Sequence, residues 1–179
     1  MAGILMKVGL ILLILSPKWS LFVYMQATGK FAHRCETLQV GACPEGWTAR
    51  GNHCYKTLDG IHSYAAATTT ACTDIGGWLP TPNTPEENAF ILSMSVPTAE
   101  GVWLNCNDLE TEGAWTCLDG GKQVRDRYWG TGEPNNAAGN ENCAVIEHND
   151  GRWHDVYCNY KHYSVVCKRS APGVLSIEA

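Results

Sequence analysis

Residues 133–155 read EPNNAAGNENCAVIEHNDGRWHD, and carboxylate and amide side chains crowd both ends of this segment. These residues include Glu133, Asn135, Asn136, Asn140, Glu141, Asn142, Asp150 and Asp155. So many oxygens repel one another unless they are solvated or hold a hard cation, and Ca²⁺ takes many such ligands at flexible geometry. Cys143 lies inside the segment and Cys158 lies just after it, which indicates a long loop whose ends are stapled together.

Cysteine is the strongest compositional signal, because the chain of 179 residues contains nine. They are Cys35, Cys43, Cys54, Cys72, Cys106, Cys117, Cys143, Cys158 and Cys167. No Cys-x-x-Cys pair occurs, so zinc-ribbon and thioredoxin-type sites are not indicated. The simplest explanation is a disulfide framework formed in an oxidising compartment. Nine is an odd number, so at least one thiol is left over.

The N-terminus agrees with an oxidising compartment. Lys7 is followed by an apolar run over 8–15, which suits a signal-peptide core and is too short to span a bilayer. We therefore expect a signal peptide over 1–29 and a secreted, extracellular protein that does not insert into the membrane. The alternative is a retained anchor, which would have to bury the charged Lys18.

The charge pattern argues against two classes of partner. The formal net charge is −5, and the basic residues form no stripe. Nucleic-acid binding and polybasic docking to a membrane both need concentrated positive charge, so we expect neither.

Helix signals precede a strand-rich half. After a short lead-in over 30–42, a hairpin is predicted around the Gly51-Asn52 turn. An alanine-rich stretch that runs into two glycines predicts a first helix over 63–75, and Thr84, Pro85 and Glu87 predict a capping box that starts a second. Short apolar runs then predict strands at 102–104, 144–146, 156–158 and 164–167, before a tail over 170–179. This order indicates an α+β domain.

The chain from Cys43 to Cys167 resembles a C-type lectin domain of the mannose-type class, in the long form with an extra N-terminal disulfide. The motifs that carry the resemblance are Trp103-Leu104, Glu133-Pro134-Asn135, Glu141-x-Cys143, Trp153-His154-Asp155, Cys158 and Cys167. The resemblance implies a domain over 43–169 with the C-type lectin-like fold. That fold has two helices, two small antiparallel sheets and a long calcium-binding loop.

The resemblance also implies a disulfide pattern. Cys106 and Cys117 lie outside the family's core pattern, and we expect them to pair with each other. Cys35 is then the odd residue, either as a free thiol or as an interchain bridge that forms a homodimer. The implied and expected pairs are Cys43–Cys54, Cys72–Cys167, Cys106–Cys117 and Cys143–Cys158.

A calcium ion that binds sugar directly is the cofactor implied by the resemblance. Carried over to this sequence, the metal ligands are Glu133, Asn135, Glu141 and Asp155. In the family, two vicinal sugar hydroxyls complete the coordination, and each donates to a carboxylate and accepts from an amide. The Glu-Pro-Asn order, with Pro134 in the cis form, is associated with equatorial 3- and 4-hydroxyls. The implied partners are therefore glycans that contain mannose, N-acetylglucosamine, glucose or fucose.

His154 departs from the family pattern, which has asparagine at this position. An imidazole nitrogen is a poor Ca²⁺ ligand, although its N–H can still donate to a sugar hydroxyl, so we keep His154 in the carbohydrate-binding set. Either water or a shifted carboxylate occupies the calcium coordination position that the asparagine would fill, or the site no longer binds calcium. The alternative function is then a lectin-like domain that binds a protein or another surface.

An auxiliary calcium site is also implied. Its ligands would be Asp108, Glu112, Asn136, Glu141 and Asn142, and the alternative interpretation is a solvated acidic loop. Low ligand charge weakens calcium binding, and two of the five ligands are amides at positions where strong binders carry aspartates.

Enzyme activity is not expected. The segment 43–167 contains no nucleophile elbow, no His-Glu-x-x-His and no phosphate-binding loop. Glu133 and Glu141 resemble a glycosidase acid–base pair, but their clustering with amides favours a role as metal ligands.

Overall fold

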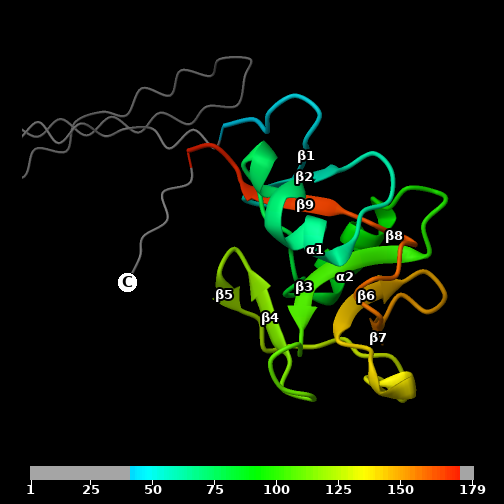
Figure 1. Ribbon diagram of the computed structural model, residues 1–179. Coiled ribbons are helices and arrows are strands. Elements are labelled where there is room, and N and C mark those ends of the chain that lie inside the picture. The colour runs from blue at the N-terminus through cyan, green and yellow to red at the C-terminus, as the bar shows by residue number, and fades with distance from the viewer. Residues whose placement is uncertain (1–40, 174–179) are drawn as a thin grey trace, which may run out of the picture. The chain divides into compact units, whose positions relative to one another are not determined.

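The computed structural model describes residues 41–173 of the chain (Figure 1). The expected signal peptide over 1–29, nearly all of the lead-in and Cys35 lie outside the described residues. The elements are β1 (Thr48–Arg50), β2 (His53–Thr57), α1 (Tyr64–Ala66), η1 (Ala67–Ala71), η2 (Thr73–Ile75), α2 (Pro85–Ser93), β3 (Gly101–Asn107), β4 (Thr116–Asp119), β5 (Lys122–Gln123), η3 (Ala137–Gly139), β6 (Cys143–Glu147), β7 (Trp153–Val156), β8 (Tyr163–Ser164) and β9 (Val166–Ser170). None of the helices within the described range is long and apolar enough to cross a membrane.

Two sheets form the framework (Figure 1). The smaller sheet has the strand order β1-β2-β9, and the larger has the order β5-β4-β3-β6-β7 with β8 added beside β3. The predicted α+β class and the two sheets are confirmed. The larger sheet is not purely antiparallel, because β8 runs parallel to β3.

The first helical region is divided into three short segments, whereas the sequence predicted one helix over 63–75. An α-helical turn is followed by the π-helical η1 and the 3₁₀-helical η2. The hydroxyls of Thr69 and Thr73 donate to the carbonyls four residues earlier, at 2.6 and 2.8 Å, and such bonds compete with regular helical ones. Gly76 ends the region at φ 72°, a left-handed conformation that glycine adopts at little cost.

Helix α2 starts as predicted, but its capping box does not form. The Thr84 hydroxyl accepts from the Glu87 N–H at 3.1 Å, and Pro85 occupies the first turn. In a capping box, Glu87 would accept from the N–H of Thr84. Its carboxylate instead accepts from the N–H of Asn83 at 2.9 Å. The capping-box prediction was wrong because the other oxygen of Glu87 is engaged in the core.

The core is built on both faces of β3. Leu104 and Trp103 point to opposite faces and belong to different buried clusters. Leu104 packs in the cluster that contains Ile146 and Trp153, and Trp103 packs in the cluster that contains Tyr163. The strand is therefore the shared wall of the two halves of the core.

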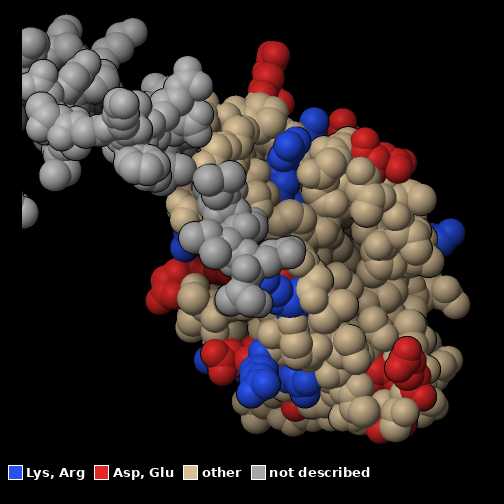
Figure 2. Space-filling view, turned by 90° about the vertical axis from the view of Figure 1, so that its left-hand side faces the viewer, with Lys and Arg blue, Asp and Glu red and all other residues tan. Residues whose placement is uncertain are grey.

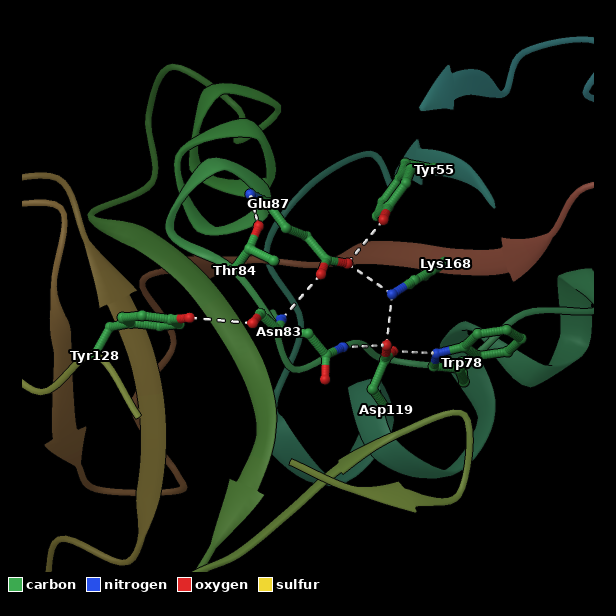
Figure 3. A network of polar contacts seen from close by, with 8 residues as sticks. All are labelled: Tyr55, Trp78, Asn83, Thr84, Glu87, Asp119, Tyr128 and Lys168. Atoms are coloured by element: carbon green, nitrogen blue, oxygen red, sulfur yellow. Dashed lines mark hydrogen bonds and ion pairs between the residues drawn. The ribbon is translucent and has the colours of Figure 1, made fainter. Parts of the chain in front are cut away.

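A buried charge network joins the two sheets to α2 (Figure 3). The Nζ of Lys168, on β9, is 2.6 Å from Glu87 Oε1 and 2.5 Å from Asp119 Oδ2, and the Lys168 residue is only 2% exposed. The Tyr55 hydroxyl also donates to Glu87, at 2.8 Å, and Trp78 Nε1 donates to Asp119 at 2.7 Å. Sequence patterns did not reveal this network.

Four disulfides connect the described residues. Their pairing is the one expected from the sequence, and Cys106 and Cys117 face each other in the β3–β4 register. The pairs are Cys43–Cys54, Cys72–Cys167, Cys106–Cys117 and Cys143–Cys158. On the face in Figure 2, Lys and Arg side chains lie interspersed with Asp and Glu side chains, so this face has no extended area of single-sign charge.

The Lys168→Met substitution tests the network. It removes the cation and leaves two largely buried carboxylates uncompensated, which should lower the free energy of unfolding by about 3–5 kcal/mol. Urea unfolding followed by circular dichroism measures this loss. Lys122→Met, on the exposed strand β5, is the matched control and should leave the midpoint unchanged. Equal midpoints for the two variants would contradict the role of Lys168.

Acid should weaken the same network through Glu87. Burial favours the neutral acid, but the hydrogen bond from the Asn83 N–H and the contact with Lys168 outweigh it and hold the pKa of Glu87 below its usual value. Because the pKa of Glu87 is lower in the folded state than in the unfolded state, ionised Glu87 stabilises the fold fully at pH values above its unfolded-state pKa. This stabilisation is lost as the pH falls through its folded-state pKa.

We therefore expect Glu87→Gln to flatten the loss of stability between about pH 6 and about pH 3. Urea midpoints measured across this range provide the test. The exposed neighbour Glu86→Gln should keep the wild-type slope, and a wild-type slope in Glu87→Gln would contradict the assignment.

Candidate functional site

Asp155 anchors the loop that precedes η3 to strand β7. Its residue is 4% exposed, and its two carboxylate oxygens accept from the backbone N–H groups of Asn135 and Asn136 at 2.9 and 2.7 Å. The Glu133–Pro134 peptide bond is cis, as the resemblance implied. Asn136 adopts a left-handed conformation at φ 45°, so the chain turns sharply and directs successive N–H groups towards one carboxylate.

Glu133 lies against this anchor with one oxygen unsatisfied. Its Oε1 accepts from Asn135 Nδ2 at 2.7 Å, whereas Oε2 is buried without a hydrogen-bond partner among the described residues. Burial and the adjacent carboxylate of Asp155 raise the pKa of Glu133. An ionised carboxylate in such a place needs a positive partner.

Glu141 joins the same site through the turn at η3. Its N–H donates to Asn136 Oδ1 at 2.9 Å, and its Oε2 accepts from the Ala137 N–H at 2.8 Å. Burial raises the pKa of Glu141, the bond from Ala137 opposes this, and the charge of Asp155 adds to the rise. The structure thus brings together the four residues expected to bind metal, which are Glu133, Asn135, Glu141 and Asp155.

The donor types of these residues suit a hard cation, but their three carboxylates are not gathered around one point. Within residues 41–173, no group of three or more His, Cys, Asp or Glu side chains is arranged to hold a metal ion. The set here mixes carboxylates with amides, which are the oxygen donors that Ca²⁺ uses. The unpaired Oε2 of Glu133 and the raised pKa values of Glu133 and Glu141 are the features that a bound cation would relieve.

His154 lies between two acids at the edge of this site. Its Nε2 is 3.1 Å from Asp150 Oδ2, and its Nδ1 is 3.6 Å from Glu133 Oε1. Burial favours the neutral form of Asp150, but the hydrogen bond from the Arg152 N–H and the contact with His154 hold the pKa of Asp150 below its usual value. The imidazole is therefore held between the carboxylates of Asp150 and Glu133.

Asp150 is among the loop oxygens noted in the sequence, but its contact with His154 was not predicted. The missed signal was the four-residue spacing of Asp150 and His154 across a tight turn. Gly130 was missed as well. A Cβ atom there would lie 3.0 Å from His154 Nε2 and 3.1 Å from Asp150 Oδ2, so a side chain would displace the pair.

The residues of the expected auxiliary site are only partly assembled. Asp108 is 3% exposed, its Oδ2 accepts from the Gly113 N–H at 2.7 Å, and its Oδ1 is buried without a partner in the described range. Its N–H donates to the Asn142 carbonyl at 3.2 Å, which brings these two predicted ligands together. Glu112 lies exposed in the same loop.

Comparison with known proteins gives a consistent result. The family model for the Lectin C-type domain matches residues 62–169. C-type lectin domain family 4 member M from Nomascus concolor is 33% identical over 129 residues, which cover 71% of this chain and 31% of that protein. A perlucin-like protein from Mytilus galloprovincialis is 32% identical over 133 residues, which cover 70% of this chain and 81% of that protein.

Solved structures agree in fold. The cow C-type carbohydrate-recognition domain of CD23, crystallised in the presence of GlcNAc2Man3 oligosaccharide, aligns with a TM-score of 0.65 and 30% sequence identity. The alignment covers 73% of this chain and 98% of the cow domain. By contrast, the chain spans only about a third of the length of the member M relatives, so the likeness to those proteins concerns one domain.

Proposed function

Because the chain belongs to the C-type lectin domain family, we propose that it is a secreted, calcium-dependent lectin with mannose-type specificity. Members of the family are non-enzymatic carbohydrate-binding proteins, and no catalytic role is assigned to any residue here. The proposed metal ligands are Glu133, Asn135, Glu141 and Asp155, and His154 is included only in the carbohydrate-binding set.

The observation that carries the proposal is the unsatisfied carboxylate of Glu133. A buried carboxylate oxygen without a partner costs free energy, and here it stands beside the carboxylate of Asp155. Bound Ca²⁺ would supply the missing positive charge and a coordination site for sugar hydroxyls. Asp155 holds the loop through two backbone N–H groups, so part of the site is already organised by the protein itself.

Sugar specificity is assigned to the Glu133-Pro134-Asn135 segment. The Glu133 carboxylate and the Asn135 amide lie side by side, with Oε1 and Nδ2 2.7 Å apart. In this structure the amide donates to the carboxylate. With calcium bound, the carboxylate would accept from a sugar hydroxyl and the amide would donate to one. We therefore assign to the chain glycans with equatorial 3- and 4-hydroxyls, such as mannose, N-acetylglucosamine and fucose.

Multivalency is part of the proposal, since a shallow site for one sugar binds weakly. Linking two such domains raises avidity without any new contact. A disulfide-linked homodimer through Cys35 would supply that link. The auxiliary calcium site, which adds Asp108, Glu112, Asn136 and Asn142, is proposed as a second, weaker site.

A second candidate function is favoured by His154. Its two contacts, at 3.1 Å with Asp150 and 3.6 Å with Glu133, give these carboxylates a partner within the protein. In that case the loop is held without the ion, and the domain binds a protein or another surface. The two candidates differ in their dependence on calcium.

Retention on mannose–agarose tests the first candidate. We expect the protein to bind in millimolar calcium, to elute in EDTA or free mannose, and to lose retention in Glu133→Gln. Glu45→Gln, which changes the same charge at an exposed position near the N-terminal end of the domain, should bind as the wild type does. No retention of the wild type in calcium would contradict the lectin proposal and favour the second candidate.

His154→Asn should strengthen calcium binding, because it restores an amide oxygen where an imidazole is a poor ligand. One additional good ligand is expected to lower the calcium dissociation constant by about tenfold. Isothermal titration calorimetry of the wild type and the variant measures the change. His62→Asn, remote from the loop in sequence and outside the ligand set, is the control. An unchanged or weaker affinity in His154→Asn would contradict the assignment.

A further inference from the structure

A second concave site lies away from the proposed metal ligands, between helix α2 and the turn that joins β6 to β7. The cavity has a volume of about 490 Å³, which is within the range of small-molecule sites. One wall is formed by Pro85, Ala89 and Leu92, which recur along one side of α2 at helical spacing. The cavity is also lined by residues of the turn and by Tyr128. We call this cavity the α2 groove.

The α2 wall is apolar and open to solvent. Pro85 and Ala89 are exposed, and Leu92 is half-buried against the core. Gly151 lines the cavity without filling it, since a Cβ atom there would contact only Leu92 Cδ2, at 3.9 Å. A helix surface with three apolar residues facing a hollow offers area that an apolar ligand can cover.

Most polar groups that line the groove are already paired within the protein. Asn88 engages both ends of its amide, because Nδ2 donates to the Gly151 carbonyl at 2.8 Å and Oδ1 accepts from Trp153 Nε1 at 2.7 Å. The Tyr128 hydroxyl donates to the Asn83 carbonyl at 3.1 Å (Figure 3).

Ser93 and His148, which also line the groove, likewise have partners within the protein. The Ser93 hydroxyl donates to the Phe90 carbonyl at 2.7 Å, and His148 Nε2 is 2.7 Å from the Ser95 hydroxyl. These contacts turn the polar atoms towards protein partners and leave ring faces and carbon atoms for a ligand.

Arg152 is the exception. It lines the groove and is exposed, and its guanidinium forms no ion pair or hydrogen bond with the described residues. The closest acid in sequence, Asp150, does not pair with this guanidinium, because its two oxygens contact the Arg152 backbone N–H at 2.7 Å and His154 Nε2 at 3.1 Å. The Arg152 guanidinium, whose charge also contributes to the lowered pKa of Asp150, is therefore the one lining group of the described residues with no direct polar partner.

We propose that the α2 groove binds a small amphipathic carboxylate, with its aliphatic chain on the Pro85–Ala89–Leu92 wall and its carboxylate on Arg152. The planar guanidinium matches a carboxylate with two parallel N–H donors. The chain buries apolar area against the methyl and methylene groups of α2. This site is separate from the proposed sugar function and does not require calcium.

Titration of the full chain with decanoate, in EDTA and below its micelle concentration, tests the proposal by calorimetry. The neutral analogue decanol separates the contribution of the carboxylate from that of the chain. We expect Arg152→Gln to weaken decanoate binding about tenfold and to leave decanol binding unchanged. Ala89→Glu, which puts bulk and negative charge on the apolar wall, should weaken both ligands.

Arg125→Gln is the matched control, because it removes the same charge from an exposed position outside the groove. It should bind decanoate as the wild type does, and circular dichroism should show that every variant is folded. Amide shifts induced by decanoate should centre on Ala89, His148 and Gly151. Equal losses in Arg125→Gln and Arg152→Gln, or equal affinity of the wild type for decanoate and decanol, would overturn the proposal. The use of EDTA keeps the result independent of the proposed calcium site.

Discussion

The buried ammonium of Lys168 is the contact on which the relation between the two sheets depends. It lies on β9 of the smaller sheet and pairs with Glu87 of α2 and Asp119 of β4 at 2.6 and 2.5 Å. A buried charge is costly unless it is paired and hydrogen-bonded, so the three elements can be buried together only in an arrangement that keeps these pairs. The apolar clusters on both faces of β3 supply the burial, and the network restricts which packing of the sheets is acceptable.

Helix α2 carries this restraint to the functional loops. One residue after Glu87, Asn88 accepts from the Trp153 indole and donates to the Gly151 carbonyl. Trp153 is followed by His154 and Asp155 on β7, and Asp155 holds the backbone of the proposed calcium loop. The same helix forms the apolar wall of the α2 groove. The two proposed sites are therefore both connected to α2.

Much of the architecture was predictable because its signals are local. The Gly51-Asn52 turn, the cap at Thr84 and the apolar runs at 102–104 and 144–146 each reflect the conformational preference of a few adjacent residues. The failures came from competition with more distant groups. Threonine hydroxyls compete for backbone carbonyls in the first helical region, which is divided into three segments. Glu87 does not complete the capping box, because its carboxylate accepts hydrogen bonds from Lys168 and Tyr55. The predicted strand at 156–158 is displaced, since β7 ends at Val156.

The sequence by itself determined which chemical groups are present and in what order. Through their resemblance to the C-type lectin family, the Glu133-Pro134-Asn135 segment, the cysteine spacing and the motif around Asp155 were enough to predict the fold and to name the candidate ligands. Only the tertiary structure decided which of these groups remain unsatisfied. The open oxygen of Glu133, the position of His154 between two acids and the free guanidinium of Arg152 all depend on partners brought close by folding. Hydrogen bonding and burial are settled by distances in space, and residue order along the chain does not record them.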